Sequence, residues 1–250
     1  LGEPAQAAAI PQMSEKERAA LLSITEEAID KPELTGEDAL AKNEALPFSD
    51  APILAAKPFA IRNYFSGAGL TALQCMTQAV YYEAAYEPLQ GRRAVAQVVL
   101  NRVRHPAFPN SVCGVVYQGS NQRVCQFSFT CDGSLNRKPS PAAWAAAEAV
   151  AREALTGYVE RSVGQATHYH ANYVSPYWAP KLTKISQLGA HIFYRWPGKW
   201  GMPGAFTDSY SGLEGIPALT NLAALSEEGL IRLISSSILV ICAITLPIFI

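Results

Sequence analysis

The sequence lacks the short motifs that mark several large enzyme classes. It contains neither a G-x-S-x-G elbow nor a glycine-rich phosphate-binding loop, which argues against serine hydrolases of the α/β class and nucleotide-dependent enzymes. No two cysteines have C-x-x-C spacing, so a zinc ribbon is not indicated. Lys and Arg are dispersed mostly as single residues, and the absence of a basic run disfavours a nucleic-acid partner.

The charge is distributed unevenly along the chain. The formal net charge of −1 divides into −5 for residues 1–70, +7 for residues 71–200 and −3 for residues 201–250 when the charged residues are counted along the sequence. A basic unit can be attracted to a polyanion such as nucleic acid, an anionic membrane or a cell wall rich in carboxylates, so the charge alone does not choose among these partners. The length of 250 residues favours one main domain with extensions. We predict an N-terminal helix and linker (1–68), a main domain (69–200) and a C-terminal extension with an apolar tail (201–250).

Three of the five cysteines lie close together. Cys113, Cys125 and Cys131 fall within 19 residues, and an exported protein would be expected to form one disulfide among them. The alternative is that all are reduced core residues. The first residues, LGEPAQAAAIPQ, resemble the small-residue end of an export signal without its apolar core, so a removed signal before residue 1 is a hypothesis.

Hydrophobic periodicity predicts a chain of mixed class, with helices dominant. Ser14 and Glu17 have capping-box spacing and predict a helix over 15–30. The proline-interrupted segment 33–65 reads as a linker or surface strap. Further helices are predicted over 71–86, 90–104, 111–119 and 141–155, a turn or short helix over 176–182, and strands over 124–133, 166–174 and 190–196. Few, late strands indicate an α+β fold, mainly helical with a small antiparallel sheet.

The tail is unusually apolar. Residues 233–250 form an 18-residue stretch without a charge, which meets the minimum length of a transmembrane span. Three Ser, one Thr and Pro247 are unfavourable in such a span. Two interpretations stay open, a membrane anchor at 233–250 and an irregular terminus.

Glu83 is the first candidate for chemistry. It lies in an apolar and aromatic helix, where desolvation by Tyr82 and Tyr86 would raise the pKa of its carboxyl group. A carboxyl group that is protonated near neutral pH can act as a general acid, as glycosidic cleavage requires. Glu87 lies one turn further on the same face. The alternative is that both are solvated helix residues.

A second candidate group lies on the predicted late strands. His168 and His170 alternate, so their side chains face one side, and His191 could approach them. We favour a polar and aromatic groove for sugar rings over a metal site and expect no cofactor. Asp132 is either a turn former or a second acidic group. The groove would be formed by Tyr169, His170, Tyr173, Tyr177 and Trp178.

Four blocks of the sequence resemble one family in the same order. They are the run from Gln78 to Gly119 containing YYEAAYEPLQGRRAVAQVVLNRVR, the block VCQFSFTCDGS, the block ATHYHANYVSPYWAP and the block LGAHIFYRW. Over roughly residues 72–197 the chain resembles the SleB-type cell wall hydrolases, the family of spore cortex-lytic enzymes and their proteobacterial relatives. Tyr82, Ala85, Tyr86 and Phe129 depart from the motifs of the spore enzymes.

The resemblance implies a lysozyme-like α+β fold and cleavage of peptidoglycan glycan strands between N-acetylmuramic acid and N-acetylglucosamine, usually by lytic transglycosylation. It also implies an exported protein, in the periplasm or cell envelope, with Glu83 as the catalytic acid. Two alternatives remain, a metal-dependent N-acetylmuramoyl-L-alanine amidase and a non-catalytic wall-binding module. The residues expected to bind substrate are Glu87, Gln126, Asp132, His168, Tyr169, His170, Tyr173, Tyr177 and Trp178.

Overall fold

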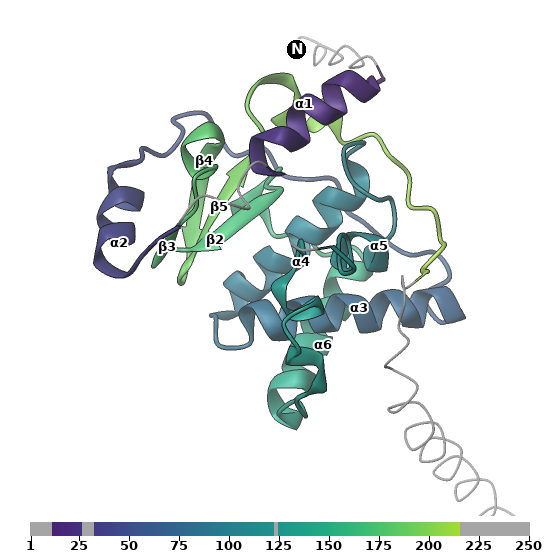
Figure 1. The fold of residues 1–250 in the computed structure, drawn as a ribbon. Helices are drawn as coiled ribbons and strands as arrows, with labels where there is room; N and C mark the ends of the chain where they lie inside the picture. The colour runs from purple at the N-terminus through teal and green to yellow at the C-terminus, as the bar shows by residue number, and fades with distance from the viewer. Residues whose placement is uncertain (1–11, 27–32, 123–124, 216–250) are drawn as a thin grey trace, which may run out of the picture. The chain divides into compact units, whose positions relative to one another are not determined.

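The computed structural model describes residues 12–26, 33–122 and 125–215, and these form helices followed by short strands (Figure 1). The helices are α1 (Glu15–Glu26), α2 (Gly36–Ala45), α3 (Gly67–Ala84), α4 (Leu89–Arg104), α5 (Val112–Val116) and α6 (Pro141–Leu155). The strands are β1 (Leu34–Thr35), β2 (His168–Ala171), β3 (Val174–Ser175), β4 (Thr183–Leu188) and β5 (His191–Arg195). The predicted α+β class, mainly helical with a small antiparallel sheet, is confirmed, and the lysozyme-like arrangement stays a prediction.

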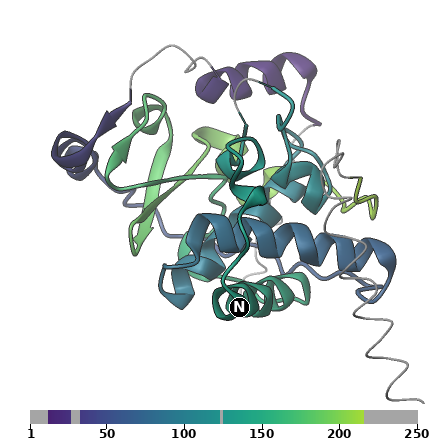
Figure 2. The ribbon, with the colours of Figure 1, turned by 60° about the horizontal axis from the view of Figure 1, so that its bottom comes forward.

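The main sheet has three antiparallel strands in the order β2-β5-β4, and β1 pairs with β3 in a separate two-stranded sheet. One face of the main sheet packs on α4, where Ala94 and Val98 contact Ile185 and Phe193. Figures 1 and 2 show α3, α4 and α6 grouped beside this sheet. The helical group and the sheet therefore share one hydrophobic core.

Most of the predicted helices are confirmed, and local signals explain where they begin. The capping box of α1 is present, since the Glu17 N–H donates to Ser14 Oγ at 3.2 Å and the Ser14 N–H donates to Glu17 Oε2 at 3.1 Å. Helix α3 begins earlier than predicted because Ser66 caps it, accepting a hydrogen bond from the Gly69 N–H. Helix α6 has the predicted bounds, with Pro141 as its first residue.

The strand predicted over 124–133 is wrong. The described part of this segment contains a short 3-10 helix, Ser128–Thr130, and then a turn. Phe127 and Phe129 are buried at alternate positions, a pattern that is also typical of a strand. Here, however, a disulfide between Cys125 and Cys131 closes the segment into a tight loop. Backbone hydrogen bonds within this loop, such as Thr130 N–H to Phe127 O at 3.1 Å, replace a sheet ladder.

The segment 33–65 contains a helix, α2, that the sequence did not predict. Contacts with distant parts of the chain hold it in place, because Lys184 of β4 donates from Nζ to the carbonyl oxygens of Asn43 (2.7 Å) and Leu46 (2.9 Å). The side chain of Asn43 donates in turn to two backbone carbonyls around β3. Strand β4 was also not predicted.

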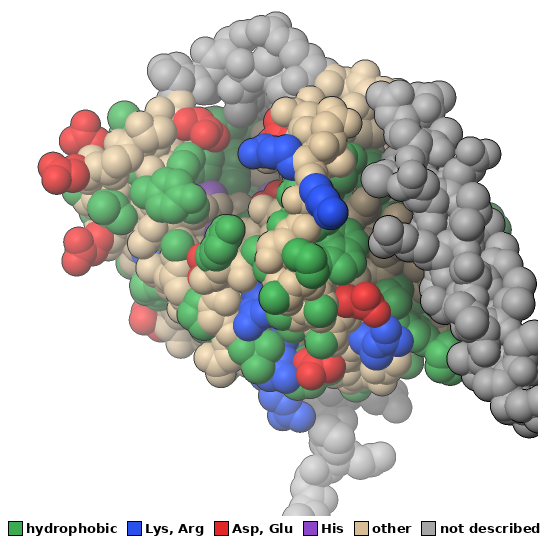
Figure 3. Space-filling view, turned by 90° about the horizontal axis from the view of Figure 1, so that it is seen from below, with side chains coloured by type: hydrophobic (Ala, Val, Ile, Leu, Met, Phe, Trp, Pro, Cys, Tyr) green, Lys and Arg blue, Asp and Glu red, His purple; other side chains and the backbone are tan. Residues whose placement is uncertain are grey.

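Figure 3 shows acidic side chains gathered over the α2 side of the molecule and Lys and Arg on other parts of the same face.

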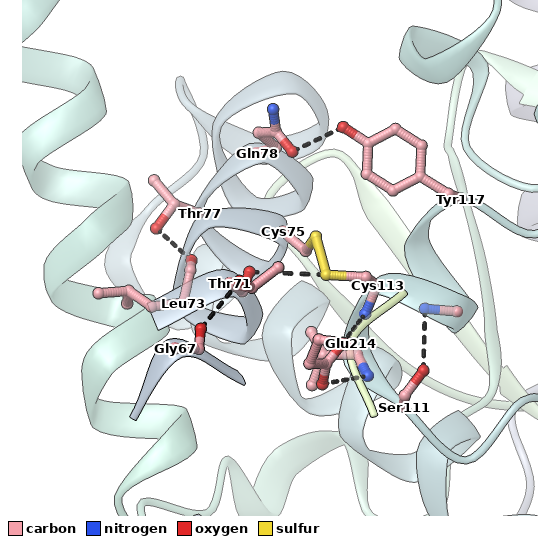
Figure 4. The surroundings of a disulfide bond; sticks show 12 residues. Gly67, Thr71, Leu73, Cys75, Thr77, Gln78, Ser111, Cys113, Tyr117 and Glu214 are labelled. Carbon is pink, nitrogen blue, oxygen red and sulfur yellow. Dashed lines mark hydrogen bonds between the residues drawn. A yellow bond between two sulfur atoms is a disulfide. The ribbon is translucent and has the colours of Figure 1, made fainter. Parts of the chain in front are cut away.

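The described residues contain two disulfides, Cys75–Cys113 and Cys125–Cys131. The predicted bridge within the cluster is confirmed as Cys125–Cys131, but Cys113 pairs with a residue outside the cluster. Cys75–Cys113 joins α3 to α5, and Figure 4 shows Glu214 beside it, accepting hydrogen bonds from the backbone N–H groups of Val112 and Cys113. The described residues after 200 thus pack on the helices.

The domain boundaries at 68 and 200 stay a prediction.

The apolar tail at 233–250 lies outside the described residues. Among the helices that are described, none is both long enough and apolar enough to cross a membrane.

Candidate active site

Glu83 lies in the last turn of α3 and is half-buried. Burial raises the pKa of its carboxyl group, and the nearby negative charge of Asp132 acts in the same direction. A hydrogen bond from Tyr169 and the positive charge of Arg102 oppose this shift in part. The Glu83 carboxyl group therefore holds its proton to a higher pH than an ordinary glutamate and can donate it to a bound molecule.

The partner of Glu83 is Tyr169 on β2. Its hydroxyl group donates to Glu83 Oε2 at 2.9 Å, and burial raises the pKa of this tyrosine well above its ordinary value. Because side chains alternate along a strand, Tyr169 faces α4 and the helices while its neighbours face away. With Oε2 occupied by this hydrogen bond, Oε1 of Glu83 is the oxygen that can carry and release the proton.

His168 and His170 face the side of β2 opposite to Tyr169. His168 packs edge-to-face on Trp196, with ring centroids 4.5 Å apart, and His170 Nε2 is hydrogen-bonded to the Tyr194 hydroxyl at 2.8 Å. Both histidines are buried, and burial lowers the pKa of each. Within the described ranges, no three His, Cys, Asp or Glu residues are arranged to hold a metal ion.

The structure divides the groove residues predicted from the sequence. Trp178 contacts the rings of His168 and His170 and lies on their side of β2. The hydroxyl group of Tyr177 donates to Ile24 O of α1 at 3.0 Å, and Tyr173 is exposed. Tyr169 alone of this group contacts Glu83 directly, so the predicted single wall of aromatic residues is split between two faces of the strand.

Glu87 lies beyond the end of α3, where it fixes the β4–β5 hairpin. Its carboxylate accepts hydrogen bonds from the backbone N–H of Ala190 at 3.1 and 3.3 Å and lies 3.7 Å from His191 Nδ1. This geometry directs the Glu87 carboxylate toward the hairpin turn, and its role in binding substrate stays a prediction.

The turn that Glu87 contacts depends on glycine. Gly189 has φ +58°, and a Cβ at this position would collide with the Glu87 carboxylate. Gly189→Ala is expected to lower the free energy of unfolding by about 1–3 kcal/mol, measured by urea denaturation. Gly198→Ala is the matched control, since Gly198 has φ +61° but open space around it. Equal losses in the two variants would contradict the contact with Glu87.

Gln126 lies in the loop closed by Cys125–Cys131, and Asp132 directly follows this loop. Asp132 is exposed, and its Oδ1 accepts a hydrogen bond from the Ser134 N–H at 2.8 Å, so the predicted turn role is present. Hydrogen bonds from Ser134 lower the pKa of this carboxyl group. The Gln126 side chain is exposed, and its backbone N–H donates to Gln118 O at 3.1 Å. Roles of both residues in binding substrate stay predictions.

Two features of the site were not predicted from the sequence. Tyr82, next to Glu83, stacks on Phe129 with ring centroids 4.8 Å apart. Arg102 of α4 is buried, and its positive charge lowers the pKa of Glu83. The adjacency of Tyr82 to Glu83 is visible in the sequence, but the stacking on Phe129 and the burial of Arg102 depend on the tertiary structure.

Comparisons with known proteins find cell wall hydrolases that are similar to part of this chain. A family model described as "Cell Wall Hydrolase" matches residues 86–194, beginning three residues after Glu83. The spore cortex-lytic enzyme of Bacillus subtilis (strain 168) is 33% identical over 121 residues, which cover 48% of this chain and 36% of that protein. The enzyme of the same name from Bacillus cereus is 32% identical over 132 residues, covering 52% and 47%. This chain belongs to the cell wall hydrolase family.

Solved structures of this cell wall hydrolase family include two similar catalytic domains. The catalytic domain of the germination-specific lytic transglycosylase SleB from Bacillus anthracis is 31% identical, with a TM-score of 0.44, and the match covers 54% of this chain and 100% of that domain. The SleB catalytic domain from Bacillus cereus is 31% identical, with a TM-score of 0.41, covering 54% and 98%. The chain spans between about a third and a half of the length of the curated relatives that it matches.

Proposed function

We propose that the chain cleaves the glycan strands of peptidoglycan between N-acetylmuramic acid and N-acetylglucosamine as a lytic transglycosylase, with Glu83 as its single acid and base. The observation that carries the proposal is a half-buried carboxyl group with a raised pKa, fixed by the Tyr169 hydroxyl group. Among the described acids near it, Glu87 is bound to the Ala190 N–H and Asp132 to the Ser134 N–H. A reaction that needs one carboxyl group suits this arrangement.

The steps of the proposed reaction follow from the acid and base forms of the Glu83 carboxyl group. Its carboxyl group gives its proton to the glycosidic oxygen, and the bond from the muramic acid C1 to that oxygen breaks. The resulting carboxylate then accepts the proton of the substrate's own 6-hydroxyl group, whose oxygen attacks C1 and closes the anhydro ring. Atoms and charges balance without water, and Glu83 ends the cycle protonated.

We also propose that the protein acts outside the cytoplasm, in the periplasm or cell envelope. Peptidoglycan lies there, and two disulfides within the described residues suit an oxidising compartment. A membrane anchor at 233–250 remains part of this proposal.

Tyr169→Phe is expected to lower kcat about tenfold and to move the basic limb of the pH–rate profile to higher pH. The hydroxyl group stabilises the charged form of Glu83, so its removal raises the pKa of the carboxyl group further. The measurement is the rate of glycan release from purified sacculi between pH 4 and pH 9, about the range over which such groups titrate. Tyr158→Phe, which removes another tyrosine-to-glutamate hydrogen bond, is the control. An unshifted limb in Tyr169→Phe would argue against the role of this bond.

The proposal is tested by digesting purified sacculi with and without EDTA and analysing the soluble products by mass spectrometry. Glycan fragments that still carry their stem peptides, released equally in both samples, are expected. Release of free stem peptides that stops with EDTA would instead identify a metal-dependent amidase. Binding to sacculi with no released product would identify a wall-binding module.

A further inference from the structure

Arg102 is a buried cation without an anionic partner in direct contact. Its side chain comes from α4, only 3% of the residue is exposed, and Nε donates to Thr167 O at 2.7 Å. The guanidinium carbon lies 5.1 Å from the ring centre of Phe108 and 5.6 Å from that of Phe127. Nη1 is buried and has no hydrogen-bond partner. In the described part of the chain, no carboxylate forms an ion pair with this side chain.

A buried cation without an ion pair lowers the stability of the folded protein. Moving a charged group out of water typically costs several kcal/mol, which a direct ion pair or full hydrogen bonding would offset. The two phenylalanine rings and one carbonyl oxygen compensate only in part. An apolar residue such as Met would fill this position on α4 at lower cost, so stability alone does not explain a guanidinium here.

The position of Arg102 connects it to the acid. Thr167, which accepts its hydrogen bond, is two residues before Tyr169 on the segment that becomes β2, and Tyr169 donates to Glu83. The groups that act on Glu83 come from three elements: Tyr169 from β2, Arg102 from α4 and Asp132 from the loop after the Ser128–Thr130 turn. Arg102 is the positive charge among them.

We propose that Arg102 is a positioning residue of the reaction, whose fixed positive charge stabilises the carboxylate form of Glu83 between the two proton transfers. The inference rests on the proposed acid–base cycle of Glu83. After Glu83 has given its proton to the leaving oxygen, its negative charge is held in a poorly solvated site until the 6-hydroxyl proton arrives. A buried cation that is bound to the backbone just before β2 lowers the energy of this state without contacting substrate.

The test compares Arg102→Met, Arg102→Gln and Arg102→Lys in the full chain. The pKa of Glu83 is measured by carbon-13 NMR of labelled glutamate carboxyl groups, with the signal assigned by its absence from Glu83→Gln. Arg102→Met and Arg102→Gln are expected to raise this pKa by about one unit or more. Arg102→Lys keeps the positive charge but places it on a shorter side chain. This variant is expected to raise the pKa of Glu83 less and to retain more of the rate of glycan release from sacculi.

Arg104→Met is the matched control. Arg104 is two residues further along α4, and its guanidinium donates to the carbonyl oxygens of Lys57 and Pro58, so its loss is expected to lower stability without changing the pKa of Glu83. A Glu83 pKa unchanged in every Arg102 variant that folds would overturn the inference. The NMR titration needs no substrate, so its result does not depend on which bond the enzyme cleaves.

Discussion

Glu83→Gln is expected to lower the rate of product release from purified sacculi by about a thousandfold. Glutamine has the same shape and can accept the hydrogen bond from Tyr169 through its amide oxygen. It cannot donate an acidic proton to the glycosidic oxygen, and it cannot take a proton back from the 6-hydroxyl group. Both halves of the proposed cycle are therefore lost while the site keeps its geometry.

The thermal stability of the variant distinguishes a loss of catalysis from a loss of folding in this experiment. Because the Glu83 carboxyl group is poorly solvated, its replacement by a neutral amide is expected to leave the melting temperature unchanged or raise it. Glu148→Gln, on the surface of α6, is the matched control and should keep full activity. A Glu83→Gln protein that retains wild-type turnover would refute the assignment of the acid.

Removal of the Cys75–Cys113 disulfide is expected to lower the free energy of unfolding by about 4 kcal/mol. The two cysteines are 38 residues apart in the sequence, so the bridge restricts a long loop in the unfolded chain. It also joins α3, which carries Glu83, to the five-residue helix α5 (Figure 4). The measurement is urea denaturation of the Cys75→Ser/Cys113→Ser variant.

The second disulfide provides an internal comparison. Cys125 and Cys131 are only six residues apart, and the same loop-length argument gives about 2 kcal/mol for their bridge. Cys125→Ser/Cys131→Ser should therefore unfold at a higher urea concentration than the variant without Cys75–Cys113. The reverse order, or equal midpoints, would contradict the loop-length account.

Local sequence signals were sufficient for the elements that carry their own caps and periodicity. Helix α6 begins at Pro141 as predicted, and α1 begins after the capping box of Ser14 and Glu17. Helix α2 was missed because the contacts that hold it, such as Lys184 to the Asn43 carbonyl oxygen, join residues far apart in the sequence. The false strand over 124–133 arose because alternating buried side chains also occur in a loop closed by a disulfide.

The candidate site also combines features that the sequence indicates with features that only the tertiary structure shows. Glu83 could be chosen as a candidate because an acid in an apolar helix is visible in the sequence itself, and its role as the acid stays a prediction. Its hydrogen bond with Tyr169 could not be predicted, since it depends on how β2 packs against the helices. Arg102 was beyond prediction for a similar reason: helical periodicity places arginines toward solvent, and only the tertiary structure shows that this one is buried.

The most direct test of the account is digestion of purified sacculi in water labelled with oxygen-18, with the new glycan ends analysed by mass spectrometry. Transglycosylation by Glu83 closes the muramic acid ring with the substrate's own hydroxyl group, so the account predicts anhydromuramic ends without heavy oxygen. Muramic acid ends that carry one heavy oxygen atom would show that water is the nucleophile and would contradict the single-carboxyl transglycosylase cycle.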